Sequence, residues 1–168
     1  MEATIPEWPA PLAPEENMSK INTGIVGTGF MAGAHLKAYR QLDNVRVAAL
    51  CNPSGRNLDG DFSDVQGNIG DDNPVKLDMT DVNAFRDYDE MLADNSIDLV
   101  DITTPTFLHH EQTIVALRAG KHVLCEKPLA RTSSQAQEIA EAAANSKGML
   151  MTAMCLRFWH EWAWVKLS

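Results

Sequence analysis

A glycine-containing turn between an apolar segment and a helical segment most constrains how this chain can fold. Residues 21–26 are rich in β-branched side chains, and residues 30–41 favour a helix. The turn and the start of that helix comprise Gly27, Thr28, Gly29, Phe30, Met31 and Ala32. Gly27 permits a tight turn, Gly29 lets an anion approach the backbone, and Ala32 allows close packing of helix on strand. The pattern predicts a strand, turn and helix with a phosphate-binding amino end.

Short apolar segments alternate with longer helical segments along the rest of the chain. Strands are expected at Ile21–Val26, Val45–Cys51, Leu99–Thr103, His122–Cys125 and Met149–Cys155, with a weaker strand at Val75–Leu77. Helices are expected at Phe30–Gln41, Tyr88–Ala93, His110–Ala119 and Ser133–Ser146. This alternation is typical of βαβ units. The predicted fold class is therefore α/β, a Rossmann-type doubly wound parallel sheet.

Two segments differ from this pattern. Four of the eight prolines lie in the first 14 residues, so residues 1–18 are predicted to form a flexible, proline-rich tail. The dinucleotide-binding domain is expected to cover residues 19–156. Within it, residues 53–74 are rich in Gly, Asp, Asn and Ser and are interpreted as a long surface loop.

Composition excludes several classes of protein. The 168 residues include 14 Lys and Arg against 23 Asp and Glu, a net charge of −9. A chain without a basic cluster is unsuited to nucleic acid, and no run of 18 apolar residues indicates a membrane span. The three cysteines are widely separated and end apolar segments, which favours buried thiols in a reducing compartment. Cytoplasmic localisation is expected.

The end of the second strand bears on the choice of dinucleotide. An acidic residue there would bind the adenosine ribose hydroxyls, but this chain has Asn52, which does not repel a 2′-phosphate. Arg56 is near enough in sequence to pair with such a phosphate. NAD and NADP therefore both remain open as the cofactor. A phosphate-transferring P-loop is excluded because its glycine-lysine pattern is absent from the sequence.

Three segments of the chain together resemble the Gfo/Idh/MocA oxidoreductases, which include glucose-fructose oxidoreductase and inositol dehydrogenase. The first is the glycine turn with His35, and the second is Asp101–Pro105 with His109. The third, Ala119–Pro128, contains Gly-Lys-His-Val followed by Glu-Lys-Pro and is highly specific. The resemblance covers residues 20 to about 162.

The resemblance implies a role for each of several residues. Lys127 would be catalytic, sharing in the proton transfer that accompanies hydride transfer, and Glu126 would lie beside it in the cofactor crevice. The loop along the nicotinamide ribose would contain Thr103, Thr104 and Pro105, with His109 starting the next helix, and Arg157 would lie near the nicotinamide. No metal site is predicted, because His109, His110 and Glu111 are interpreted as the first turn of a helix.

The resemblance also implies a second domain, which would supply most substrate contacts and a catalytic histidine. Residues 157–168 are interpreted as the start of that domain, truncated here. The expected function is NAD(P)-dependent hydride transfer to or from a sugar, cyclitol or related polyol. A noncatalytic NAD(P)-binding module or truncated gene product is the alternative. The aromatic end, with Phe158, Trp159, Trp162, Trp164 and Val165, is expected to cause poor solubility, self-association or homo-oligomer formation.

Overall fold

The computed structural model describes residues 20–65 and 75–159. The predicted tail, residues 1–18, and the aromatic residues Trp162, Trp164 and Val165 lie outside the described residues. Contacts assign residues 20–153 to one compact unit, and the remaining described segment, 154–159, belongs to a separate unit. That segment contains the 3-10 helix Cys155–Phe158, in which Arg157 is exposed. The predicted role and domain of Arg157 stay predictions.

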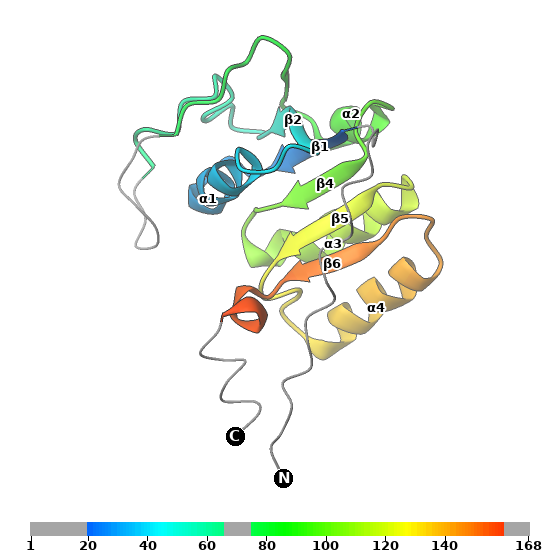
Figure 1. The fold of residues 1–168 in the computed structure, drawn as a ribbon. Helices are drawn as coiled ribbons and strands as arrows, with labels where there is room; N and C mark the ends of the chain where they lie inside the picture. Colours follow the sequence, from blue (N-terminus) through cyan, green and yellow to red (C-terminus); the bar gives the residue numbers. More distant parts are fainter. Residues whose placement is uncertain (1–19, 66–74, 160–168) are drawn as a thin grey trace. The chain divides into compact units, whose positions relative to one another are not determined.

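A parallel six-stranded sheet forms the framework of the larger unit (Figure 1). Its spatial order is β3-β2-β1-β4-β5-β6. The strands are β1 (Ile21–Val26), β2 (Val45–Cys51), β3 (Asn83–Phe85), β4 (Leu99–Ile102), β5 (His122–Glu126) and β6 (Leu150–Ala153). The order turns back between β1 and β4, which is the switch point where doubly wound sheets bind ligands. The predicted Rossmann-type fold class is confirmed.

Helices cover both faces of the sheet (Figure 1). They are α1 (Phe30–Tyr39), α2 (Tyr88–Ala93), α3 (Thr106–Arg118) and α4 (Ser133–Ala144). One core lies between α1 and the sheet and includes Ala32, Leu36, Ile25 and Leu50. The other core lies beneath α2, α3 and α4. Both faces of the central strands are therefore covered, as is usual for a parallel sheet.

One sequence prediction in the β2–β3 region is wrong. The weak strand expected at Val75–Leu77 is reduced to an isolated antiparallel bridge between Asp61 and Lys76, and the third strand is Asn83–Phe85 instead. The described part of the predicted loop, residues 53–65, contains no helix or extended strand, as expected, but Phe62 within it is only 3% exposed and packs with Val75 beneath α1. Two large apolar side chains, far apart in the sequence, thus complete the core on this face.

The α3 helix begins earlier than the sequence indicates. It starts at Thr106, with Pro105 as its N-cap, rather than at His110. Proline suits this position because its ring fixes φ close to the −59° found here and no bond within the helix needs its missing N–H. His109 is consequently inside the first turn and is not the residue that starts the helix. The α4 helix begins as predicted, with the Thr132 hydroxyl accepting a hydrogen bond from the Gln135 backbone N–H.

Candidate functional site

The Gly27–Gly29 turn has the shape that a bound pyrophosphate requires. Gly27 has φ +91°, and a Cβ atom there would lie 2.8 Å from the backbone nitrogen of Thr104. Gly29 caps α1, and a Cβ atom there would meet nothing within 4 Å. The first turn of α1 carries no acidic side chain. No side chain caps the backbone N–H groups at the amino end of α1, and open space adjoins them. The residues present therefore fit an anionic dinucleotide.

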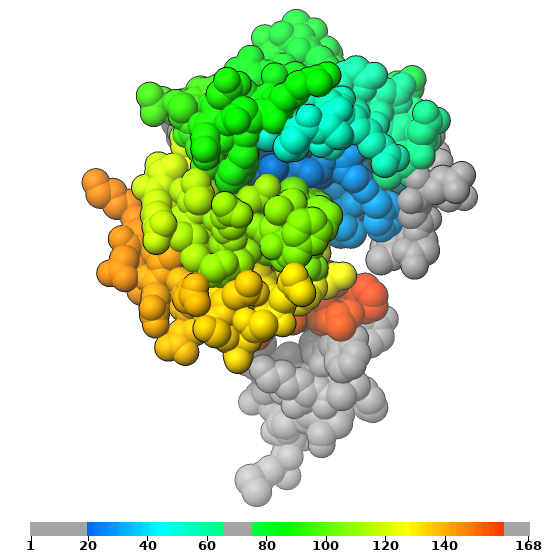
Figure 2. Space-filling view, turned by 180° about the vertical axis from the view of Figure 1, so that it is seen from behind, coloured from blue at the N-terminus to red at the C-terminus, as the bar shows by residue number. Residues whose placement is uncertain are grey.

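The β4 strand and its following loop are fastened to this turn. The Thr103 hydroxyl lies 2.7 Å from the carbonyl oxygen of Gly27 and donates a hydrogen bond to it. The Thr104 hydroxyl donates to the Gln112 side chain at 2.6 Å. Figure 2 shows atoms of the β1–α1 segment, in blue, set between the cyan and green segments that follow β2 and β3 and the yellow-green segment at the start of α3. The loops after β1, β2 and β4 therefore converge at the carboxyl edge of the sheet.

The side chains predicted to face the adenosine end are largely used within the protein. Thr28 is 1% exposed, and its hydroxyl donates to the Arg56 carbonyl and accepts from the Asn52 amide. The side-chain oxygen Oδ1 of Asn52 accepts from the N–H and hydroxyl of Ser54. These hydrogen bonds hold the loop after β2 in place, and Asn52 links that loop to the glycine turn after β1. The Arg56 side chain is exposed.

A second arginine lies at this loop and was missed by the sequence analysis. Gly55 has φ +76°, and a Cβ atom there would lie 2.5 Å from Nη2 of Arg86. The Arg86 guanidinium therefore packs directly over the backbone of Gly55. Arg86 follows β3, whose end pairs with the end of β2 through Cys51 and Phe85. Its signal was weak in the sequence because the short edge strand β3 was not predicted.

The Glu126-Lys127-Pro128 turn follows β5 at the same edge. The Lys127 side chain is exposed, and the Lys127–Pro128 peptide bond is cis. Glu126 is 5% exposed, and its two carboxylate oxygens lie 3.1 Å from His35 Nε2 and 2.9 Å from the Lys127 backbone nitrogen. The Glu126 side chain thus points into the protein, away from solvent.

His109 is also buried, contrary to what a cofactor-contacting side chain would show. It is 1% exposed, and its Nδ1 and Nε2 each lie 2.8 Å from a carbonyl oxygen, those of Pro128 and Thr104 respectively. The ring therefore joins the loop after β4 to the turn after β5. His110, its neighbour, points elsewhere and pairs with Glu138 at 2.9 Å. Within the described part of the chain, no group of three or more metal-ligating side chains is assembled.

A buried charged cluster, defined by His35, Tyr39, Asp101 and Glu126, underlies the Lys127 turn. His35 Nδ1 lies 2.7 Å from Asp101 Oδ2, and the Tyr39 hydroxyl donates to the same oxygen at 2.8 Å. Burial alone would lower the pKa of His35, but the hydrogen bonds and charges of Asp101 and Glu126 outweigh it and raise the pKa to about 10. Burial, reinforced by Asp101, raises the pKa of Tyr39.

The pKa of Glu126 shifts in the direction that matches this arrangement. Burial would raise it, yet the hydrogen bonds from His35 and from the Lys127 N–H, with the positive charges of both residues, lower it. At neutral pH the carboxylate is therefore ionised and faces an imidazolium. Sequence patterns single out His35 and Asp101 but say nothing of this contact, because only the fold brings α1 against β4 and β5.

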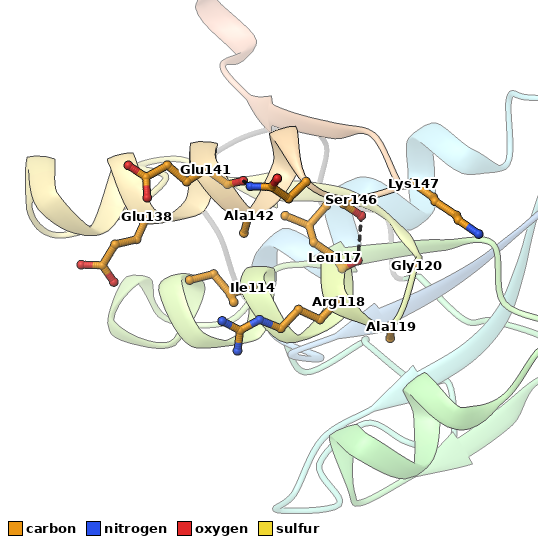
Figure 3. A pocket seen from close by; sticks show the side chains of 11 residues that line it. Ile114, Leu117, Arg118, Ala119, Gly120, Glu138, Glu141, Ala142, Ser146 and Lys147 are labelled. Carbon is orange, nitrogen blue, oxygen red and sulfur yellow. Dashed lines mark hydrogen bonds between the residues drawn. The ribbon is translucent and has the colours of Figure 1, made fainter.

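A groove between α3 and α4 lies apart from this site (Figure 3). It is lined by the last turns of both helices and closed at one end by the Ser146 hydroxyl, which donates to the Leu117 carbonyl at 2.7 Å. The end of α3 adjoins the start of β5, so the groove lies toward the amino edge of the sheet. The glycine turn and Lys127 lie at the carboxyl edge. In addition, none of the described helices is long and apolar enough to cross a membrane.

Comparisons with known proteins agree with this geometry. The chain is 32% identical to levoglucosan dehydrogenase of Pseudarthrobacter phenanthrenivorans, covering 83% of this chain and 34% of that protein. It is 33% identical to an NADP(+)-dependent scyllo-inositol 2-dehydrogenase of Bacillus subtilis, covering 74% and 37%. The crystal structure of an NAD-binding oxidoreductase from Klebsiella pneumoniae is 31% identical, with a TM-score of 0.65 and coverage of 83% and 35%. The chain thus spans about a third of the length of each.

The family model matches most of the sheet unit. It describes an oxidoreductase family with an NAD-binding Rossmann fold, and it covers residues 21–154, from the start of β1 to the residue after β6. That span contains the glycine turn, the loop after β4 and the Lys127 turn. On this evidence the chain belongs to the Gfo/Idh/MocA oxidoreductase family.

Proposed function

We propose that this chain is the cofactor-binding part of an NAD(P)-dependent oxidoreductase that transfers a hydride to or from a carbon of a sugar, cyclitol or related polyol. The observation that carries the proposal is the convergence of the open amino end of α1, the Thr104 loop and the exposed Lys127 at one edge of the sheet. The names of the similar dehydrogenases support the substrate class. Since the chain spans about a third of those proteins, the complete activity is part of the proposal.

The residues would divide the work along the sheet. The backbone N–H groups at the start of α1 would receive the pyrophosphate, and Thr103, Thr104 and Pro105 would line the path toward the nicotinamide ribose. The nicotinamide, when bound, supplies the hydride acceptor or donor. Arg157 would lie near that ring. Glu126 and His109 would act by holding the turn and the loop, since both side chains are buried and paired within the protein.

Lys127 would hold and release the proton that accompanies hydride transfer. Its Nζ is on an exposed side chain at the carboxyl edge, so a polyol hydroxyl can reach it. In the oxidation direction the hydroxyl proton passes toward Nζ as the C–H bond breaks, and in the reduction direction the ammonium returns it to the developing alkoxide. A lysine can do this because an amine exchanges one proton without forming a covalent intermediate.

Two observations bear on the cofactor's adenosine end and on localisation. Arg56 and Arg86 lie at the loop after β2, and the residue that ends this strand is followed by Asn52, an amide where an acidic residue would repel a 2′-phosphate. This arrangement favours binding of NADP as well as NAD. The free thiols of Cys51 and Cys125 are buried, whereas Cys155, also predicted to be buried, is exposed. The two buried free thiols fit a reducing compartment, and we expect the enzyme in the cytoplasm. We also expect self-association, because Phe158 and Trp159 are half-exposed.

Calorimetry with NAD and NADP, followed by turnover on a polyol panel, tests the proposal. Binding of either dinucleotide together with hydride transfer is the expected result for the complete enzyme. Binding without transfer would favour a noncatalytic NAD(P)-binding module. Failure to bind either dinucleotide would refute both functions.

A further inference from the structure

His35 lies between two buried carboxylates that come from neighbouring strands. Its Nδ1 is 2.7 Å from Asp101 Oδ2 and its Nε2 is 3.1 Å from Glu126 Oε1. Asp101 is fully buried on β4, and Glu126 ends β5 with 5% exposure. Among the described residues, His35 is the one side chain that contacts both carboxylates, and it lies in the second turn of α1. The His35 ring thus links α1, which follows the glycine turn, to β4 and β5. The Thr104 loop follows β4, and the Lys127 turn follows β5.

The charges in this cluster require the ring to be an imidazolium. Two carboxylates buried side by side repel each other unless a cation lies between them. Tyr39 donates one hydrogen bond to Asp101 Oδ2, and Asp101 Oδ1 is buried without a hydrogen-bond partner in the described part of the chain. His35 is therefore the main source of compensating charge for both acids. Removing it would leave Asp101 with the neutral Tyr39 hydroxyl and Glu126 with the Lys127 backbone N–H.

Both oxygens of the Glu126 carboxylate are occupied by groups other than the Lys127 ammonium. Its Oε1 is held by His35, and its Oε2 accepts the backbone N–H of Lys127 at 2.9 Å. On the other side of the turn, His109 Nδ1 lies 2.8 Å from the Pro128 carbonyl oxygen. The turn is thus anchored at both ends, and the Lys127 side chain projects from it while its neighbouring carboxylate stays inside.

We propose that His35 is a positioning residue that keeps the Glu126 carboxylate away from the Lys127 amine and thereby keeps that amine reactive. This inference rests on the proposed role of Lys127 in proton transfer. Without the ring, Glu126 is free to rotate toward Lys127 and to form an ion pair with its ammonium. An opposite charge within about 4–6 Å favours the charged form of an amine. An amine held in such an ion pair reacts more slowly with an acylating reagent.

The reactivity of Lys127 toward an acetylating reagent measures this effect directly. Each lysine's rate of acetylation at pH 8 is read by mass spectrometry in the complete chain, with exposed Lys147 as the internal reference. We expect His35→Gln to slow acetylation of Lys127 relative to Lys147 at least threefold. His110→Gln is the matched control, because it removes an imidazole that also pairs with a glutamate, Glu138, at 2.9 Å. That control should leave the ratio unchanged.

Buried Lys121 reports whether the fold survives in each variant. It is 7% exposed, and its Nζ donates to the carbonyl oxygens of Asp94 and Ile97. A Lys127 ratio within 1.5-fold of the unaltered chain, with Lys121 still protected, would overturn the proposal. The double variant His35→Gln/Glu126→Gln should restore the rate, because the carboxylate that would pair with Lys127 is gone. A structural role for His35 alone would give no such rescue.

A single isosteric variant keeps the test decisive if Lys121 becomes reactive in His35→Gln. In Glu126→Gln with His35 present, acetylation of Lys127 should change by less than twofold, since the carboxylate is already held away. An acceleration of more than threefold would contradict the proposal. Protection of Lys127 by saturating NADP tests the proposed function separately. If NADP does not protect Lys127 while His35→Gln still slows its acetylation, the proposed function is refuted and the positioning role of His35 is retained.

Discussion

Raising the pH from 7 to 9 should weaken the fold by discharging His35. The pKa of this imidazole is raised from 6.5 to about 10 in the folded chain, because the two carboxylates outweigh the effect of burial. A raised folded-state pKa gives stability that is fully present below pH 6.5 and is lost as the pH rises through 10. Linkage then gives a contribution of about 4 kcal/mol at pH 7 and about 1 kcal/mol at pH 9. The free energy of unfolding should therefore fall by about 3 kcal/mol over this interval.

Urea denaturation at pH 7, 8 and 9 measures this loss. The same series on His35→Gln is the control, since this variant lacks the imidazole that loses its proton between pH 7 and pH 9. The variant should be less stable at pH 7 and nearly flat with pH by comparison. Parallel pH dependences in the two proteins would refute the charge argument. An NMR titration in which the His35 ring loses its proton near pH 7 would refute it equally.

Four substitutions at the carboxyl edge have separable consequences. Gly27→Ala should destabilise the fold by about 2 kcal/mol or more, measured by urea denaturation, because φ is +91° and the new Cβ would overlap the Thr104 backbone; an unchanged midpoint would contradict the geometry. Lys127→Ala should abolish turnover in the complete enzyme while cofactor affinity stays within tenfold, about 1.4 kcal/mol by calorimetry; retained turnover would remove Lys127 from its role. Asn52→Asp should shift binding toward NAD, because a carboxylate repels a 2′-phosphate; a constant NAD/NADP affinity ratio would count against this. Arg86→Ala should weaken NADP binding more than NAD binding, and equal losses would show that Arg86 does not read the phosphate.

The elements that could be predicted from the sequence are those whose signal is local. The β1 strand, the glycine turn and the start of α1 follow one another directly. Their residue types predict the turn and the packing of the helix on the strand without information from the rest of the chain. The β3 strand escaped prediction because three residues at a sheet edge, two of them exposed, carry no periodicity. The position of Phe62 escaped for a different reason, since its burial depends on contact with α1.

The candidate site shows the same division. Thr103 and Thr104 are placed at the glycine turn, as a doubly wound sheet requires, because strand order alone brings β4 beside β1. The orientation of individual side chains was beyond the sequence: His109 and Glu126 point into the protein and pair there. Their partners are a carbonyl and an imidazole contributed by segments 19 and 91 residues away. Such contacts depend on tertiary geometry, which a linear pattern does not encode.

The strand order sets the distance between the residue that bears on the choice of NAD or NADP and the residue proposed to transfer the proton. Asn52 follows β2, Lys127 follows β5, and β1 and β4 lie between them. Three interstrand spacings amount to about 14 Å, which exceeds the range over which substitutions usually couple. Changes at the adenosine end should therefore add to changes at Lys127 without interaction. A lineage with this sheet could exchange NAD for NADP many times while the proton-transferring edge stayed untouched.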